Sequence, residues 1–335
     1  MSAIIDGTEG STGAEFFELH ENQEEPPLNT KTSSIATSVF NYFFPRHPYT
    51  QCREFRLIPD VIEKFIGGFV FTSAVGQGGG IVFHKDLGMC QKILSDLKVH
   101  SIRNIDYSIV VLDIGRNNAT CYPGGKIAID RGYLDKIDRF VSHKKEMGFN
   151  GYVDPETGKT ISYENVTKKD VLAALIGHEM IHADARHGMR VLEQELAWSI
   201  LSSAAKLLLA IKLAPLIGTV TAICTTMIIG AAVEVIAWSY FSSRDHHQEF
   251  EADQYGMINT SKAGYSVSGS FFLQVVLNDG EAIVSYDSPY TKFFMKLLDL
   301  FFGDTHPSYQ ERQKALFDQL SSDQFIAVGK PTTAS

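Results

Sequence analysis

The sequence predicts an α+β fold that is predominantly helical, with a small β-sheet beside one central helix. Apolar residues recur with helical spacing over most of the chain, whereas β-branched residues concentrate in two central segments, residues 107–112 and 126–129. The segment His178–His182 (HEMIH) lies within the strongest helical pattern. A chain of 335 residues is long enough to bury a sizeable core in one large domain.

Residues 1–50 are predicted to form a disordered acidic tail, because acidic residues crowd this stretch and Pro26-Pro27 interrupts it. The stretch has neither the basic and apolar regions of a secretory signal nor the arginines of a mitochondrial presequence. Within it, the aromatic segment Ser38–Phe44 is expected to dock on the body of the protein rather than on a membrane surface.

Two helices and two strands are expected next. Helical spacing covers Asp60–Phe71 and His84–His100, with the glycine-rich connection Gly76–Gly80 between them. No Lys-Ser/Thr pair follows those glycines, so they do not indicate a phosphate-binding loop. Tyr107–Leu112 and Lys126–Ile129 are predicted to pair as strands, since both are short, apolar and bounded by turn residues.

The rest of the chain is mostly helical in pattern. Tyr133–Lys145 predicts a helix, and Gly148–Tyr163 predicts a loop because it is rich in Gly, Pro, Asn and Thr. Thr167 followed by Asp170 forms a capping-box pattern at the start of the helix that contains HEMIH. A later helix is expected over His247–Ile258.

The HEMIH segment has a mechanical rationale. His178 and His182 lie about one helical turn apart on the same face, so both imidazoles can reach one metal ion. Glu179 is placed to act as general base on a metal-bound water. The alternative is an ordinary helix with two histidines, because chance produces HExxH about once in fifty chains of this length. The other motifs therefore have to decide between the two.

A catalytic zinc site takes three protein ligands, and the sequence offers two candidates for the third. His187 is disfavoured, because a continuous helix would turn it by about 100° per residue to the side opposite His178; it is expected to be structural or to contact a ligand. Glu249 is favoured, with Asp253 on the same helix face to accept the spare N–H of a ligand histidine. Glu251 is expected to face solvent.

A third segment, THPSYQER, fits the same chemistry. Peptide hydrolysis develops negative charge on the carbonyl oxygen, which requires a donor near the metal. His306 and Arg312 are candidates for that donor. In isolation the His-Pro pair would indicate only the start of a helix.

The segments HEMIHADARH, SRDHHQEFEADQYG and THPSYQER, in this order, resemble the HtpX and CAAX prenyl protease family of gluzincin zinc metallopeptidases. The likeness is greatest to the Oma-type and BepA-like branch of quality-control proteases. Asn118-Ala119, Pro123-Gly124-Gly125 and Arg131-Gly132 resemble a strand pair of that family, and Arg53–Gly67 resembles the segment before it. The likeness spans residues 50–320 and implies a gluzincin fold with a small β-sheet beside the HExxH helix.

The resemblance also implies one Zn²⁺ ion per chain and a role for each matching residue. The implied metal ligands are His178, His182 and Glu249. The implied catalytic base is Glu179, with Asp253 as the partner of a ligand histidine and His306 and Arg312 as stabilisers of the transition state. An extended protein or peptide substrate would pair with an edge strand formed by Asn117, Asn118, Ala119, Thr120 and Cys121. Thr120 and Cys121 replace larger apolar residues common in the family, which leaves substrate preference open.

Charge and cysteine content restrict which partners and which compartment are expected. The net charge of −9 and the absence of a basic run argue against nucleic-acid binding. The cysteines are far apart and form no CxxC pair, which favours a reducing compartment without identifying it. Their positions are Cys52, Cys90, Cys121 and Cys224.

Residues 51–322 are predicted to form the metallopeptidase domain, followed by a tail at 323–335. An apolar helical hairpin, 199–241, is expected between the two metal-binding helices. Its residues 213–233 carry no charge and are long enough to span a bilayer. The flanking helices share one metal, so two spans or none are expected. We predict a hairpin that associates with a membrane; a hairpin buried over the site is the alternative.

These observations predict a zinc metalloendopeptidase that cleaves misfolded or membrane-associated proteins. The alternative is a catalytically weak chaperone or binding module of the same fold. Against that alternative, the three ligands and Glu179 are all intact. A structural membrane protein with an accidental HExxH is disfavoured by the ordered downstream motifs.

Overall fold

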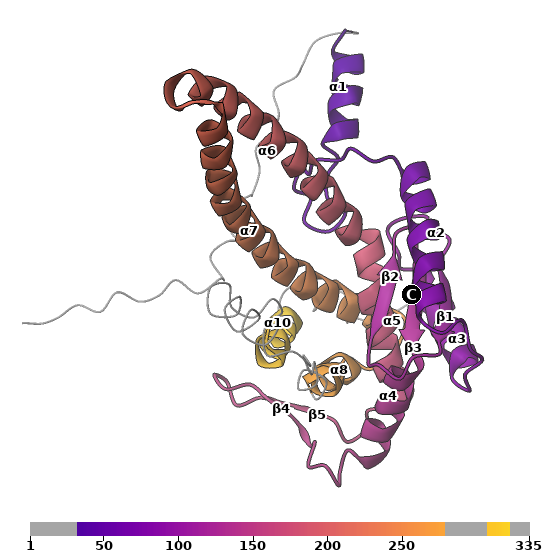
Figure 1. Ribbon diagram of the computed structural model, residues 1–335. Coiled ribbons are helices and arrows are strands. Elements are labelled where there is room, and N and C mark those ends of the chain that lie inside the picture. Colours follow the sequence, from indigo (N-terminus) through magenta and orange to yellow (C-terminus); the bar gives the residue numbers. More distant parts are fainter. Residues whose placement is uncertain (1–31, 279–306, 322–335) are drawn as a thin grey trace, which may run out of the picture.

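The computed structural model describes residues 32–278 and 307–321 and is mostly helical, as the sequence predicts (Figure 1). The helices are α1 (Thr32–Phe43), α2 (Asp60–Gln77), α3 (Leu87–Lys98), α4 (Arg131–His143), α5 (Lys168–Asp184), α6 (His187–Ile217), α7 (Thr219–Lys262), α8 (Ser268–Asn278) and α10 (Tyr309–Leu320). The strands are β1 (Ser108–Leu112), β2 (Ala119–Tyr122), β3 (Lys126–Asp130), β4 (Gly151–Val153) and β5 (Thr160–Ser162).

A three-stranded sheet has the order β1-β3-β2, with β1 parallel and β2 antiparallel to β3. The two segments predicted to pair, β1 and β3, therefore do so. Ile127 and Ile129 of the central strand are fully buried. Strand β2 is an edge strand of the sheet. The turn from β2 to β3 contains Gly124 and Gly125, whose φ angles of 81° and 86° glycine adopts without steric cost.

Helix α5 runs through the centre of the molecule. Its N-terminus carries the predicted capping box, in which the Thr167 side chain accepts a hydrogen bond from the Asp170 backbone and the Asp170 carboxylate accepts one from Thr167. Nearly every residue of α5 is buried, because α3, α7, α8 and β2 all pack against it. A helix covered on all sides is apolar all round, so the polar residues that remain on α5 need specific partners.

Helices α6 and α7 project from the body as a long hairpin (Figure 1). The hairpin turns at Gly218, whose φ of 81° reverses the chain. Ala222 and Thr226 are buried between the two helices, while most apolar side chains near the turn are exposed. The helix expected at His247–Ile258 is the end of α7, which continues from the hairpin into the core.

Two expectations about irregular segments are wrong. Residues 32–50 do not belong to a disordered tail: they include α1, and Tyr49 stacks on Tyr255 of α7 with ring centroids 4.3 Å apart. Residues 148–163 are not a plain loop, because β4 and β5 pair as an antiparallel hairpin. Each strand has only three residues, too few for an alternating pattern to stand out; Tyr152 anchors the hairpin against Phe271 and Phe317.

Candidate metal centre

The two histidines of the HEMIH segment face each other on α5. Their Nε2 atoms lie 3.0 Å apart, because a spacing of four residues stacks side chains one turn apart. The Nδ1 atom of His178 lies 3.0 Å from the Asp253 carboxylate, which accepts its N–H. The His178 Nε2 lone pair is thus directed into the space between the two rings.

Glu249 of α7 completes the group. Its carboxylate oxygens lie 3.5 Å from His178 Nε2 and 3.5 Å from His182 Nε2. Helices α5 and α7 approach closely at Gly177 and Gly256: a Cβ at Gly256 would lie only 3.0 Å from the His178 backbone nitrogen. This contact between two glycines brings Glu249, two turns earlier on α7, within reach of both histidines. The sequence gives no direct sign of this contact.

Asp253 lies at the centre of a buried network behind His178. Arg312 of α10 binds its carboxylate at both oxygens, with distances of 2.6 and 2.7 Å, and Gln274 of α8 donates a hydrogen bond at 3.1 Å. Arg312 also lies 3.3 Å from Glu249. Burial alone would raise the pKa of Asp253, but the Arg312 charge and the hydrogen bonds lower it well below the ordinary value. Asp253 is therefore ionised at neutral pH.

Glu179 points to the other side of His178, toward strand β2. Burial raises the pKa of its carboxyl to about 7, opposed in part by the His178 charge and by a hydrogen bond from the Cys121 backbone. The backbone N–H of Cys121 points away from β3. The carbonyls of Asn118 and Tyr122 point to the β3 side and accept hydrogen bonds there. The free edge of β2 thus passes directly beside Glu179.

The donor set fits a divalent transition metal. Two imidazole nitrogens and one carboxylate oxygen, from His178, His182 and Glu249, all lie within 4.8 Å of one another. This combination is that of catalytic zinc sites, in which a fourth position stays open. Burial lowers the pKa of His182 to about 4, so its ring is neutral and has a lone pair to offer.

A model of peptidase family M48 matches residues 89–319, more than half of the chain. The chain belongs to peptidase family M48. M48 proteins are zinc-dependent metallopeptidases, and the matched region runs from α3 to α10, which includes every residue of the group described above. No curated protein matches the chain in sequence.

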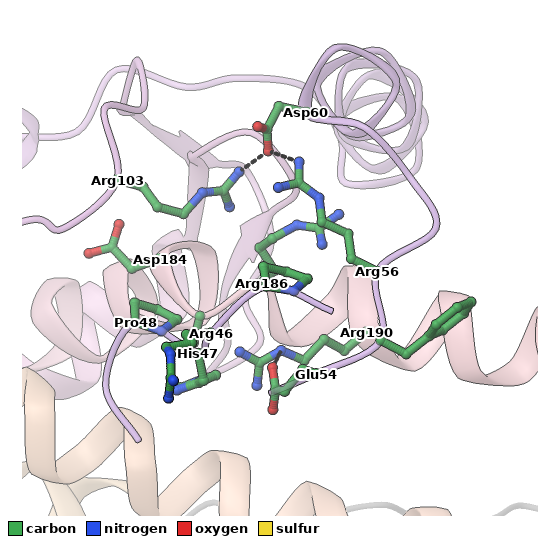
Figure 2. A pocket seen from close by; sticks show the side chains of 13 residues that line it. Arg46, His47, Pro48, Glu54, Arg56, Asp60, Arg103, Asp184, Arg186 and Arg190 are labelled. Carbon is green, nitrogen blue, oxygen red and sulfur yellow. Dashed lines mark hydrogen bonds and ion pairs between the residues drawn. The ribbon is translucent and has the colours of Figure 1, made fainter. Parts of the chain in front are cut away.

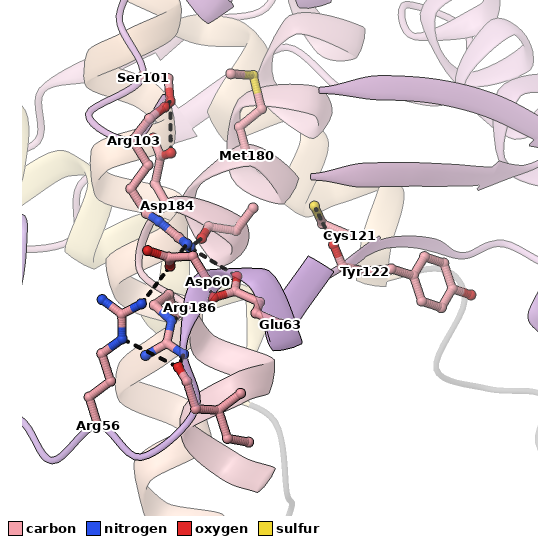
Figure 3. Close-up of polar contacts among 12 residues, drawn as sticks. Arg56, Asp60, Glu63, Ser101, Arg103, Cys121, Tyr122, Met180, Asp184 and Arg186 are labelled. Carbon is pink, nitrogen blue, oxygen red and sulfur yellow. Dashed lines mark hydrogen bonds and ion pairs between the residues drawn. The ribbon is translucent and has the colours of Figure 1, made fainter. Parts of the chain in front are cut away.

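The M48 core of this chain has an unexpected break between α5 and α6. Arg186 adopts a left-handed conformation with φ of 58°, which is unfavourable for a residue with a side chain. Its guanidinium is held by the buried Glu63 at 2.7 Å (Figure 3). Glu193 also contacts it, at 3.3 Å. Arg103 pairs with the same Glu63 at 3.0 Å. These buried ion pairs hold the chain in the strained turn.

The break changes the position of His187. The prediction that His187 lies away from His178 assumed a continuous helix, and that assumption is wrong. After the turn, His187 Nδ1 lies 2.8 Å from His182 Nδ1, so it contacts a candidate ligand without joining the group of three. The expectation that Glu251 faces solvent is also wrong: its carboxylate lies 3.1 Å from the buried His47 and 3.5 Å from His187.

An arginine-rich pocket borders the same break (Figure 2). The segment around His47 and the start of α6 form its walls. Two of its arginines pair with acids of the same pocket, in Arg190–Glu54 and Arg56–Asp60, both at 2.7 Å. The Arg190–Glu54 pair fastens the N-terminal segment to the α5–α6 junction, whereas Arg56–Asp60 lies within that segment.

Among the other predicted site residues, Ala119, Thr120 and Cys121 lie in β2, and Asn117 and Asn118 immediately precede it. His306 lies outside the described residues. Tyr133 was not predicted: its hydroxyl is buried with no hydrogen-bond partner in the described part of the chain. Burial raises its pKa, as does the neighbouring charge of Glu179.

Proposed function

We propose that this M48 peptidase is a zinc-dependent endopeptidase in which His178, His182 and Glu249 hold the metal and Glu179 is the general base. One observation carries the proposal: two residues of a group with zinc-type donors share their helix with a buried carboxyl, Glu179, which in turn contacts the free edge of a β-strand. Metal, base and a place for an extended chain are the three parts that peptide hydrolysis requires.

A zinc ion held by these residues would lower the pKa of a coordinated water and polarise the scissile carbonyl. Glu179 accepts the proton of the attacking water and passes it to the leaving amine. Its pKa of about 7 in the absence of metal suits a group that both accepts and donates a proton near neutral pH. Asp253 keeps His178 in the tautomer that offers Nε2.

Arg312 has a different role from the one that the resemblance implies. Its guanidinium is buried and bound to Asp253 and Glu249, so it orients two residues of the centre rather than facing the substrate. Another residue must then donate to the carbonyl oxygen in the transition state. His306 remains the proposed donor.

The substrate would add to β2 as a further strand. The free edge offers the backbone groups of Ala119 and the Cys121 carbonyl, because the alternate residues pair with β3 and the Cys121 N–H is donated to Glu179. Ala119→Pro removes one free-edge N–H but no bond to β3. We expect it to raise KM for a protein substrate more than for a dipeptide-sized one. Equal effects on both substrates would contradict strand addition.

We further propose that the substrates are misfolded or membrane-associated proteins, as in the Oma-type and BepA-like branch. Within the described residues, the helical stretch Lys168–Ile217 is long and apolar enough to cross a membrane, by length and composition alone. Near the hairpin turn, Leu216 and Val220 are 78% and 76% exposed. Exposed apolar surface of this extent is typical of a membrane or protein contact.

Flotation of the full chain with phosphatidylcholine vesicles tests the membrane contact. We expect Leu216→Asp with Val220→Asp to remain at the bottom of the gradient while the wild type floats. Val153→Asp, at an equally apolar position 58% exposed on β4, serves as the control and should float. Flotation of the hairpin variant would refute the contact.

The decisive experiment replaces Glu179 by Gln. The variant should retain one zinc per chain and lose cleavage of an unfolded protein, because the amide cannot accept the proton of water. Cleavage at the wild-type rate would eliminate the mechanism. If the wild type binds unfolded chains but does not cut them, the alternative of a chaperone or binding module is correct.

A further inference from the structure

A second group of metal-type side chains lies beside the metal centre. His47, His187 and Glu251 place two imidazole nitrogens and a carboxylate oxygen within 4.8 Å of one another. Both histidines are 2% exposed. Within residues 32–278 and 307–321, His47 Nε2, His187 Nε2 and Glu251 Oε1 have no hydrogen-bond partner. The two histidine nitrogens contact the Glu251 carboxylate by distance, at 3.1 Å and 3.5 Å. Such a group either binds a second cation or is a network of hydrogen bonds, and the positions of the protons decide which.

Two backbone hydrogen bonds determine which ring nitrogen of His47 carries the proton. Its Nδ1 accepts the N–H groups of Tyr49 at 3.2 Å and Thr50 at 3.0 Å, so Nδ1 carries the lone pair. Burial lowers the pKa of His47 to about 3, which makes the ring neutral with its single proton on Nε2. That Nε2–H faces Glu251 Oε1 at 3.1 Å. Coordination through Nε2 would force the proton onto Nδ1, against two backbone N–H groups.

The contact with His182 determines which ring nitrogen of His187 carries the proton. His182 Nδ1 and His187 Nδ1 lie 2.8 Å apart, so one of them donates and the other accepts. His182 Nε2 faces His178 and Glu249, where a metal ligand needs a lone pair. The proton of His182 therefore sits on Nδ1 and points at His187. Because His187 Nδ1 accepts this hydrogen bond, the ring's own proton is on Nε2, which lies 3.5 Å from Glu251 Oε2.

We infer that His47, Glu251 and His187 form a buried relay that fixes the tautomer and orientation of His182, rather than a second metal site. Glu251 places one carboxylate oxygen 3.1 Å from His47 Nε2 and the other 3.5 Å from His187 Nε2, so its charge faces both N–H groups. Each histidine of the metal centre thus has a carboxylate behind it. Asp253 contacts His178 directly, whereas Glu251 reaches His182 through His187. The three are positioning residues, and the inference rests on the proposed zinc centre.

The relay also links distant parts of the chain. His47 belongs to the segment that the ion pairs around Arg186 and Arg190 fasten to the α5–α6 junction (Figure 2). The strained turn at Arg186 is what brings His187 against His182. Docking of this N-terminal segment is therefore coupled to the geometry of a metal ligand.

Counting the metal separates the two possibilities. The full chain is saturated with zinc, freed of excess metal and analysed for zinc per chain. We expect one ion in the wild type, one in Glu251→Gln and none in Glu249→Ala. Two ions in the wild type, with one lost in Glu251→Gln, would establish a second metal site and overturn the relay. No bound zinc in the wild type would refute the proposed function itself.

Zinc affinity tests the relay directly, by competition with a chelator and without any activity assay. Glu251→Gln and His187→Ala should each weaken binding about 10–100-fold, the usual effect of removing a partner of a ligand histidine. The double variant should lose no more than His187→Ala alone, because Glu251 acts through His187. His47→Ala should weaken binding and His47→Gln, which keeps a donor, should restore it.

Two controls keep the result interpretable. The exposed His143 lies outside the network, so His143→Ala should leave affinity unchanged. Melting temperatures of the metal-free variants report folding separately from metal binding. A merely structural role would lower those temperatures, leave affinity unchanged and give additive effects. Tight binding of a single zinc ion by both Glu251→Gln and His187→Ala would refute the relay while leaving the proposed function intact.

Discussion

The contact between Gly177 and Gly256 sets the distance between the two helices that carry the candidate ligands, and Gly256→Ala perturbs it with one methyl group. The added Cβ would lie 3.0 Å from the His178 nitrogen, 3.1 Å from the Gly177 carbonyl carbon and 3.2 Å from the His178 Cα. All three neighbours are backbone atoms, so no side chain can rotate away. Helix α7 must move from α5 by a few tenths of an ångström to restore ordinary contacts.

The substitution should change both the free energy of unfolding and the affinity for zinc. Overpacking of this kind costs about 1–3 kcal/mol of unfolding free energy, while Gly→Ala within a helix contributes about 1 kcal/mol in the opposite direction. A metal site tolerates ligand displacements of about 0.2 Å. A shift of α7 by more than that moves Glu249 out of register with both histidines. We therefore expect zinc affinity to fall about tenfold or more, even though no ligand is changed.

Gly68→Ala is the matched control. Gly68 lies within α2, and a Cβ there meets only the flexible Lys126 side chain at 3.5 Å. The difference between the two variants in urea unfolding of the metal-free protein isolates the packing cost, and chelator competition measures zinc affinity. If Gly256→Ala gains as much stability as Gly68→Ala, or binds zinc as tightly as the wild type, the close helix contact does not position Glu249.

Two other predictions concern buried charges. Glu63→Ala removes the buried carboxylate that Arg103 and Arg186 share, which leaves Arg103 with the exposed Asp60 and Arg186 with Glu193. We expect it to destabilise the protein by about 3 kcal/mol in urea unfolding; a loss below about 1 kcal/mol would contradict the strained-turn argument. Asp253 is a carboxyl whose pKa is lowered in the folded state, so its contribution to stability is present above its ordinary value of 3.8 and is lost as the pH falls below it. The stability difference between the metal-free wild type and Asp253→Asn should therefore shrink on acidification from about pH 6 to pH 3, and a constant difference would contradict the assignment.

The sequence predicts those parts of the site that depend on local spacing. His178 and His182 are one helical turn apart wherever the helix forms, and the capping box at Thr167 shows where that helix starts. Glu249 and Asp253 share a face of α7 for the same reason. The segments predicted to form β1 and β3 are distinguished from helices by their β-branched residues. In each case the spacing of residues along a single helix or strand is enough to predict the structure.

Features that depend on tertiary contacts escape such patterns. The residue at the helix break is Arg186, neither a glycine nor a proline, and its ion pairs with Glu63 and Glu193 stabilise it in a left-handed turn. Glu251 reads as a solvent-facing residue on α7 because its partner, His47, is far away in the sequence. The assumption of a continuous helix therefore misplaces His187, and the unforeseen contact with His47 misplaces Glu251.

The charges of the centre bear on the proposed role of Glu179 as a base. Without metal, burial raises the pKa of Glu179 to about 7; the Glu249 charge adds to this rise, and the charges of His178 and Arg312 oppose it. A divalent cation between His178 and Glu249 would reverse the sign of the local field and favour the ionised carboxylate. An ion bound there would thus both lower the pKa of a coordinated water and favour the ionised form of Glu179. Arg312 keeps the metal-free centre from carrying two unbalanced buried carboxylates.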